Sequence, residues 1–319
     1  MAFASDWLAL REPADRAARD KNLLDQAIAL AGPAPVIVDL GCGTGSSVRT
    51  LAPLLPTQTT WRLVDNDQAL LDIAATDAGP SATLHLLDIT DVHRLPLDGA
   101  TLVTCSALLD LVTEEWLREL ARTLTVPFYA ALTYNGMMRW IPALETDQAI
   151  TEAFNAHQRH DKGLGPALGP TAADTAAQVF EEAGFRVVSS ESLWSLESTE
   201  APLQRALVEG IGQAAKERGD EDALSWATHR IAAAEQTQCL IGHTDVVAIP
   251  PGAPQEVPDA ERSCVEAGVE SPAGDANGGT DHREFRRVVE RRTTSPRFVW
   301  SGGRPPGRAH RDRANRSIS

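Results

Sequence analysis

The 319-residue sequence contains no long apolar run. No stretch approaches the ~20 consecutive apolar residues that a membrane-spanning helix needs. The first nine residues also lack the basic start and apolar core of a signal peptide. With 43% hydrophobic and 23% charged residues, the composition is that of an ordinary globular protein. We therefore expect a cytoplasmic protein that has no membrane partner.

Cysteine is scarce, and the four cysteines form no CxxC pair. This spacing argues against a zinc knuckle and against a thioredoxin-type redox site. Cys105 and Cys239 lie in apolar runs, where a cysteine usually acts as a small buried hydrophobic side chain. We predict no metal site.

Residues 1–254 contain no basic stripe. Residues 255–319 hold 12 Arg and 10 acidic residues, a formal charge of +2, so residues 1–254 carry −17 and the whole chain −15. A domain this acidic repels a phosphate backbone unless a local basic surface compensates. The sequence therefore disfavours DNA or RNA as a substrate.

Apolar runs and helical patterns alternate along residues 36–249, which is typical of a doubly wound α/β fold. We predict a mainly parallel, seven-stranded sheet with helical inserts that roof the active site. The predicted domain spans residues 1–254, with an N-terminal helical lid over about 1–34 and inserts at about 136–170 and 198–236. The predicted strands are 36–40, 60–64, 82–87, 101–106, 126–132, 185–190 and 238–249.

The last part of the chain has a different composition. Residues 255–319 are rich in Arg, Gly, Pro and Ser, contain no Lys and show no apolar periodicity. We predict that this tail is disordered. Its composition fits either an extended or frame-shifted reading frame or a basic interaction arm.

A glycine-rich turn follows the first predicted strand, at Asp39-Leu40-Gly41-Cys42-Gly43-Thr44-Gly45. Glycines allow a tight turn and the close approach of a ligand, and the helix that follows offers free N–H groups. Asp65 ends the next strand, where a carboxylate can accept the ribose hydroxyls of a nucleoside. The third glycine of the nicotinamide fingerprint is missing, because Ser46 stands there. The alternative interpretation is a turn that needs glycine for its geometry alone.

At these positions the sequence resembles the class I S-adenosylmethionine-dependent methyltransferases. Residues 36–45 match the first motif of that family, and an acid ends the second strand, as the second motif requires. The resemblance extends over about residues 30–250 and indicates the cofactor S-adenosyl-L-methionine, with S-adenosyl-L-homocysteine as product. It implies that Asp39 orients the donor's amino group, Asp65 holds the ribose, and Asp88 meets the adenine beside Ile89. The donor-binding residues that it implies are Asp39, Gly41, Cys42, Gly43, Gly45, Asp65, Asn66, Asp88, Ile89 and Ser106.

Candidate acceptor-side residues follow the fifth predicted strand. His157 and His160 are one helical turn apart and could serve as a base or as substrate donors, or could lie on a solvated helix face. Tyr134 should face the mouth of the pocket. Upstream, Arg11, Arg16 and Arg19 could meet an acidic substrate group or the donor carboxylate, although the pattern favours a solvated helix face.

The leading hypothesis is a methyltransferase that acts on a small-molecule acceptor. Catalysis can then come largely from placing the acceptor and the methyl group in line. A non-catalytic donor-binding scaffold or regulatory subunit is the alternative, and an NAD-dependent oxidoreductase is a weaker one. No Asn-Pro-Pro-Tyr signature for amino or base nitrogen methylation follows the fourth strand. The sequence indicates neither the acceptor atom nor the oligomeric state.

Overall fold

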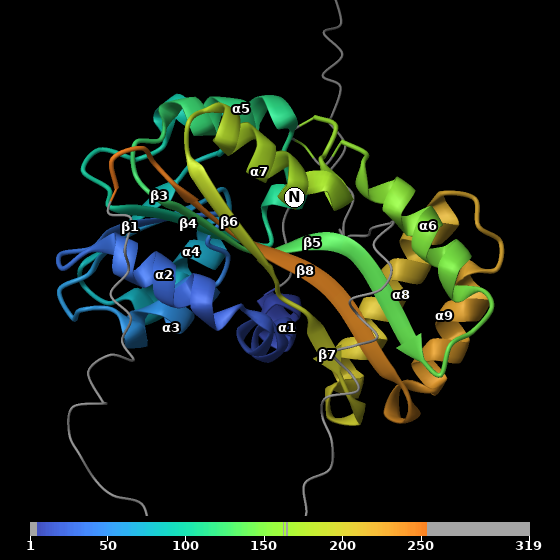
Figure 1. Cartoon of the computed structure of the whole chain (residues 1–319). Coiled ribbons are helices and arrows are strands. Elements are labelled where there is room, and N and C mark those ends of the chain that lie inside the picture. Colours follow the sequence, from blue (N-terminus) through green and yellow to red (C-terminus); the bar gives the residue numbers. More distant parts are fainter. Residues whose placement is uncertain (1–4, 162, 164, 254–319) are drawn as a thin grey trace, which may run out of the picture.

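The computed structural model describes residues 5–161, 163 and 165–253 (Figure 1). The predicted tail, 255–319, lies outside the described residues. One eight-stranded sheet runs through the molecule in the order β3-β2-β1-β4-β5-β8-β6, and β7 pairs with β8. The strands are β1 (Val36–Leu40), β2 (Thr60–Asp65), β3 (Ala82–Leu86), β4 (Leu102–Ser106), β5 (Phe128–Ile141), β6 (Arg186–Glu191), β7 (Trp194–Leu196) and β8 (Gln238–Ile249).

The first five strands are parallel, and β8 is antiparallel to its neighbours β5, β6 and β7. The prediction of a doubly wound, mainly parallel sheet is thus confirmed. Two details differ from it. The fifth strand continues to Ile141 instead of ending at Leu132, and the three-residue β7 was not predicted.

Helices cover both faces of the parallel part of the sheet (Figure 1). One face carries α2, α3 and α4, and the other carries α5 and α7. The helices of the described residues are α1 (Ser5–Ala18), α2 (Lys21–Ala31), α3 (Ser46–Leu51), α4 (Gln68–Ala78), α5 (Glu114–Thr123), α6 (Asp147–Gln158), α7 (Ala172–Glu182), α8 (Ala201–Glu217) and α9 (Ala223–Ala232). No helix in this part of the chain is both long and apolar enough to cross a bilayer.

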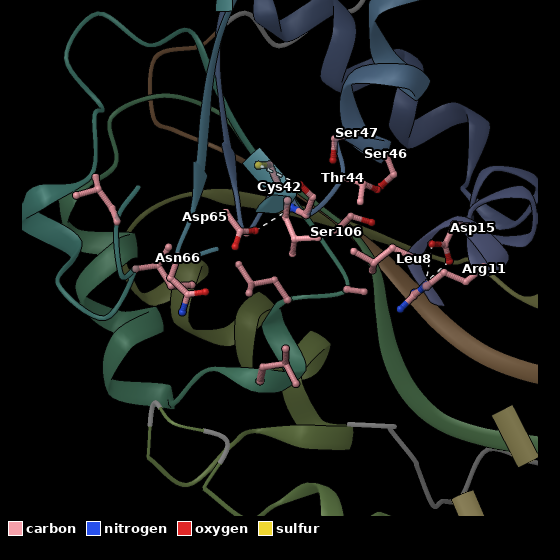
Figure 2. Close-up of a pocket in the computed structure, with 18 of the residues that line it drawn as sticks. Leu8, Arg11, Asp15, Cys42, Thr44, Ser46, Ser47, Asp65, Asn66 and Ser106 are labelled. Atoms are coloured by element: carbon pink, nitrogen blue, oxygen red, sulfur yellow. Dashed lines mark hydrogen bonds and ion pairs between the residues drawn. The ribbon is translucent and has the colours of Figure 1, made fainter. Parts of the chain in front are cut away.

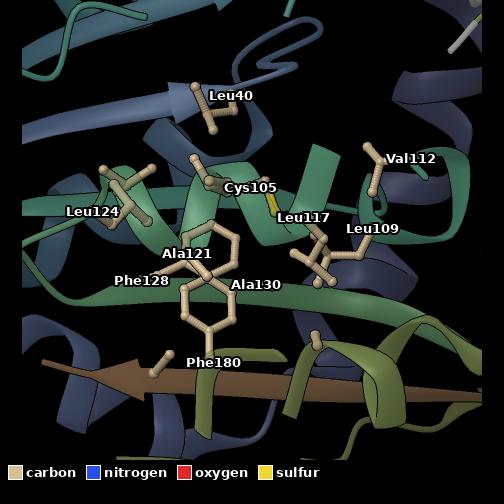
Figure 3. Close-up of a cluster of buried hydrophobic side chains, with 14 of the residues drawn as sticks. Leu40, Cys105, Leu109, Val112, Leu117, Ala121, Leu124, Phe128, Ala130 and Phe180 are labelled. Atoms are coloured by element: carbon tan, nitrogen blue, oxygen red, sulfur yellow. The ribbon is translucent and has the colours of Figure 1, made fainter. Parts of the chain in front are cut away.

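Sequence and packing agree in α5. The Thr113 side chain accepts a hydrogen bond from the Trp116 N–H, which caps the helix start. Trp116, Leu117 and Leu120 then lie on one buried stripe against the sheet. In Figure 3 this helix packs over β4 and β5, and the Phe128 and Phe180 rings stack with centroids 5.2 Å apart. The middle strands are therefore covered on both faces.

The strands β5 and β8 run well beyond the parallel part. Met138 to Ile141 of β5 pair with Gln238 to Ile241 of β8, after two register shifts. Such bulges bend a strand and increase its twist. Helices α6, α8 and α9 pack around this extension in a separate apolar cluster that includes Trp140, Phe154 and Trp226. We use the name extension for this region, which consists of the paired outer ends of β5 and β8, strand β7, and the helices α6, α8 and α9.

Candidate functional site

A cavity of about 250 Å³ lies at the carboxyl ends of β1, β2 and β4, beneath α1 (Figure 2). We call it the α1 cavity. Ligands of doubly wound sheets bind at this edge. Eight of the ten predicted donor-binding residues line it: Gly41, Cys42, Gly43, Asp65, Asn66, Asp88, Ile89 and Ser106. Asp39 and Gly45 lie behind the wall.

The glycine turn has left-handed backbone at all three of its glycines. The φ angles of Gly41, Gly43 and Gly45 are 63°, 54° and 86°. A Cβ atom on Gly45 would lie 3.1 Å from the Cα atom of Ala74, which belongs to the backbone of α4. This glycine therefore allows the turn to pack against α4, and that packing role explains why it does not line the cavity.

Asp65 both holds the turn and faces the cavity. One carboxylate oxygen accepts a hydrogen bond from the Gly43 N–H at 2.9 Å, and the other accepts from the Asp67 N–H at 3.1 Å. Burial raises the pKa of Asp65, although these backbone N–H groups favour its charged form. Asp67 caps α4 through the Ala69 N–H. Because each oxygen of Asp65 keeps a second lone pair, the carboxylate can still accept hydroxyl hydrogens from a ligand.

Asp88 has a similar double use after β3. It lines the cavity, and its Oδ1 atom accepts a hydrogen bond from the Thr90 N–H at 3.0 Å. The side chain therefore shapes the turn and still presents acceptor capacity to the cavity.

Asp39 is fully buried beneath the glycine turn. Neither carboxylate oxygen has a hydrogen bond of ordinary geometry from the described residues. Burial raises the pKa of Asp39 to about 7, although the Ser47 hydroxyl and the Arg19 guanidinium favour the charged form. A buried acid with unsatisfied oxygens is costly to an isolated domain unless a partner completes it.

Arg19 is the cationic counterpart of Asp39. It lies between α1 and α2, is 7% exposed, and donates a hydrogen bond from Nη2 to the Ser106 hydroxyl at 3.1 Å. Its Nε and Nη1 atoms are buried without a hydrogen-bond partner among the described residues. Burial alone would lower its pKa, but Tyr129 and Asp245 raise it. The expectation of a solvated face is wrong for Arg19, because its side chain reaches inward behind the cavity wall.

The N-terminal helix supplies two cavity residues that the sequence did not single out, Leu8 and Asp15, and it places Arg11 beside them. Leu8, Arg11 and Asp15 of α1 line the cavity, and the Arg11 side chain is 14% exposed. The solvated face expected for these arginines exists only at Arg16, whose side chain is 56% exposed. In the sequence, the spacing of Arg11 and Asp15, one helical turn apart, already indicates that the two side chains can form an ion pair on one face of the helix.

The three predicted catalytic residues do not line the α1 cavity. His157 interacts with Glu217 of α8 at 3.2 Å, and the His160 ring nitrogen accepts from Arg218 at 3.1 Å. Tyr134 is 4% exposed and packs in the apolar cluster of the extension, instead of facing the pocket mouth as predicted. His157 in the last turn of α6 and His160 just after this helix both contact the end of α8, so the structure does not bring the three residues together at the site.

The two inserts also differ from the expected roof. Of residues 136–170, only Gly163 lines the cavity, and residues 198–236 contribute none of its lining. The reason is that α8 and α9 bury their apolar faces against the extension. The helix that covers the cavity is α1. No group of three or more His, Cys, Asp or Glu side chains within the described ranges could hold a metal ion.

Residues 37–126 match the family model described as "Methyltransferase domain". This segment contains the glycine turn, Asp65 and Asp88. This part of the chain is a methyltransferase domain. The family predicted from the motifs is therefore confirmed, and the cavity is the pocket that this domain forms at the edge of its sheet.

Solved structures similar to this methyltransferase domain share little sequence with it. One is an S-adenosylmethionine-dependent methyltransferase from Geobacter sulfurreducens, with 16% identity and a TM-score of 0.43, covering 78% of this chain and 100% of that one. Another is the geranyl diphosphate C-methyltransferase from Streptomyces coelicolor A3(2), with 14% identity and a TM-score of 0.40, covering 72% and 75%. No curated protein matches the chain.

Proposed function

We propose that the methyltransferase domain, residues 1–254, binds S-adenosylmethionine in the α1 cavity and methylates a small-molecule acceptor. The observation that carries this proposal is the pair of buried, incompletely bonded charges beside the glycine turn. Asp39 has two carboxylate oxygens and Arg19 two guanidinium nitrogens without a hydrogen-bond partner among the described residues. Because both side chains lie behind the cavity wall, they would act on the donor through bound water. The amino-acid head of the donor has the complementary pair, an ammonium and a carboxylate.

The remaining cavity residues fit the nucleoside part of the same donor. Asp65 would accept from the ribose hydroxyls, and Asp88 would accept from the adenine amino group with Ile89 against the ring. Gly41 and Gly43 leave room for the donor beside the backbone. A nicotinamide dinucleotide fits less well, because Ser46 stands where its fingerprint requires the third glycine.

The donor supplies a methyl group on a positively charged sulfur. The carbon–sulfur bond breaks as the acceptor atom forms its bond to the methyl carbon, and an acceptor proton leaves to solvent or to a base. The protein's part is to hold both molecules in line and to exclude water, which the covering helix α1 does through Leu8. No histidine lines the cavity within the described residues.

Calorimetry tests the proposal. The wild-type domain should bind S-adenosylhomocysteine and should not bind NAD. Arg19→Gln and Asp39→Asn should each weaken binding of S-adenosylhomocysteine by about 10- to 100-fold, because each removes a charged hydrogen-bond partner. Binding of NAD alone would overturn the proposal.

Transfer of a labelled methyl group to extracted small molecules separates an enzyme from a scaffold. A scaffold would bind S-adenosylhomocysteine with the same sensitivity to Arg19→Gln yet label no small molecule. Labelling that disappears in Asp39→Asn supports the enzyme.

A further inference from the structure

Arg11 is the sole lysine or arginine that lines the α1 cavity within the described residues. The acids on the same wall are Asp15, Asp65 and Asp88. In Figure 2, Arg11 lies with Leu8 and Asp15 at the α1 end of the cavity, apart from Asp65 and Asn66. The cavity therefore has a nucleoside end with acids and a second end with a guanidinium.

The guanidinium of Arg11 is fixed from two sides. Its Nε and Nη2 atoms donate to the two oxygens of Asp15 at 2.8 and 3.1 Å. Its central carbon lies 5.1 Å from the ring centroid of Trp194 in β7. The Trp194 indole N–H in turn donates to Asp15 at 3.1 Å. Such a side chain loses little further conformational freedom when a ligand binds.

The hydrogen-bonding capacity left on the pair of Arg11 and Asp15 consists of donors. A guanidinium has five N–H groups, and the pair with Asp15 uses two of them. Asp15 is occupied, because its oxygens accept from Arg11 twice and from Trp194 once. A ligand at this end must therefore bring acceptor atoms, and oxyanions are the acceptors that a permanently charged guanidinium prefers.

We propose that Arg11 binds an oxyanion, a carboxylate or a phosphate, carried by the methyl acceptor. This inference rests on the proposed function, which assigns the donor's own charged ends to Asp39 and Arg19. Arg11 then remains available for the second substrate. Leu8 of the same helix lines the cavity beside it, so the oxyanion should be attached to an apolar body.

The first test asks whether Arg11 serves the donor. Arg11→Gln should leave the affinity for S-adenosylhomocysteine within about threefold of wild type, whereas Arg19→Gln lowers it strongly. Arg16→Gln is the matched control, because it removes a charge from the same helix outside the α1 cavity. A loss of about tenfold or more in Arg11→Gln, with unchanged affinity for 5′-methylthioadenosine, would assign Arg11 to the donor carboxylate and overturn the inference.

The second test measures oxyanion binding directly by calorimetry. The domain, saturated with S-adenosylhomocysteine, is titrated with benzoate and with phenyl phosphate, and in parallel with the neutral benzamide and phenol. At least one oxyanion should bind about 10-fold or more tightly than its neutral counterpart, and this preference should disappear in Arg11→Gln. Which of the two binds identifies the anionic group.

A double variant guards against misfolding. Arg11→Gln with Asp15→Asn removes both charges together, so no unpaired carboxylate remains beneath α1. It should keep S-adenosylhomocysteine binding and lose the oxyanion preference. Equal binding of charged and neutral probes by the wild type, or a preference that survives in both variants, overturns the inference. Failure of S-adenosylhomocysteine to bind even the wild type would refute the proposed function instead.

Discussion

Two buried arginines show how the parallel part of this domain differs from its extension. Arg19, behind the α1 cavity, is 7% exposed, donates one hydrogen bond, to Ser106, and lies 6.0 Å from the centroid of the Tyr129 ring. Arg230, in α9 of the extension, is 3% exposed and donates to both oxygens of Asp147 and to the Pro142 carbonyl. It also lies over the Trp140 ring at 5.2 Å. The guanidinium of Arg19 therefore keeps unused hydrogen-bond donors, whereas that of Arg230 has partners on several sides.

This difference is the one expected between a ligand-binding region and a region that only stabilises the fold. Buried polar groups without partners cost stability, so a fold keeps them where a ligand can complete them. A buried ion pair with several hydrogen bonds instead fixes one packing of the elements around it. The proposed function therefore assigns donor binding to the parallel part, whereas α6, α8 and α9 pack around the outer ends of β5 and β8.

Removing Arg230 gives the largest expected loss of stability. Arg230→Met should lower the free energy of unfolding by about 3–5 kcal/mol, because Asp147, whose side chain is only 14% exposed, loses its cation. Thermal and urea unfolding measure the change. The matched control is Arg205→Met on α8, whose exposed pair with Glu235 should contribute at most about 1 kcal/mol.

The same variant tests whether the two regions are independent. Below its melting temperature, Arg230→Met should bind S-adenosylhomocysteine as tightly as wild type, because the α1 cavity contains no residue of α9. A parallel loss of donor affinity in the folded protein would show that the extension shapes the cavity and that the two regions are not independent.

The next effect falls on the donor side. Asp65→Ala should weaken S-adenosylhomocysteine binding by an amount on the order of 1.5–3 kcal/mol, measured by calorimetry. It should also lower the melting temperature, because the Gly43 and Asp67 N–H groups lose their acceptor. Asp65→Asn, which keeps one carbonyl oxygen, should recover part of the stability. Unchanged affinity in Asp65→Ala would remove this residue from the donor site.

Much of the parallel part could be predicted from the sequence, because its signals are local. A short apolar strand ends in a glycine turn or an acid, and the residues needed for each inference stand next to each other. Val36–Leu40 has the predicted bounds, and the predicted donor residues Asp65 and Asp88 do line the cavity. The exception is Gly45, which was predicted to bind the donor but packs against α4, a contact that the local sequence does not indicate.

The extension could not be predicted in the same way, because its contacts connect distant segments. The outer half of β5 is a strand because Met138 to Ile141 find Gln238 to Ile241, a hundred residues later. Trp194 of β7 is near Arg11 only after the chain has folded. The density of charged groups around His157 suggested a substrate loop, whereas α8 provides their partners.

The titration of Asp39 should link pH to both stability and donor binding. Its pKa in the folded protein is about 7, above its ordinary value near 4, so the folded state favours the protonated acid. Stability from this group is fully present below pH ~4 and is lost as the pH rises toward about 7. The donor ammonium prefers the ionised acid, so donor affinity should rise with pH up to about 7.

The rise in affinity should be at most about tenfold per pH unit, the limit for one proton. Calorimetry at several pH values, in buffers with different ionisation enthalpies, detects the proton released on binding. Asp39→Asn is the control and should bind weakly with a flat profile over the same range. A wild-type profile that is equally flat would mean that Asp39 does not titrate with donor binding.

The smallest effect is expected at His160, just after α6. His160→Ala removes a ring that contacts Arg218 and the backbone carbonyls of Ala156 and His157, all on the surface of the extension. Exposed contacts of this kind contribute about 0–1 kcal/mol. Because the cavity has no wall from this helix, the affinity for S-adenosylhomocysteine should stay within about twofold of wild type. The turnover of any acceptor identified by methyl labelling should change as little.

Arg218→Gln, which removes the partner of the ring, is the matched variant and should behave in the same way. A fall in turnover in His160→Ala that Arg218→Gln does not share, at unchanged donor affinity, would place this imidazole at the acceptor, and the extension would then belong to the active site.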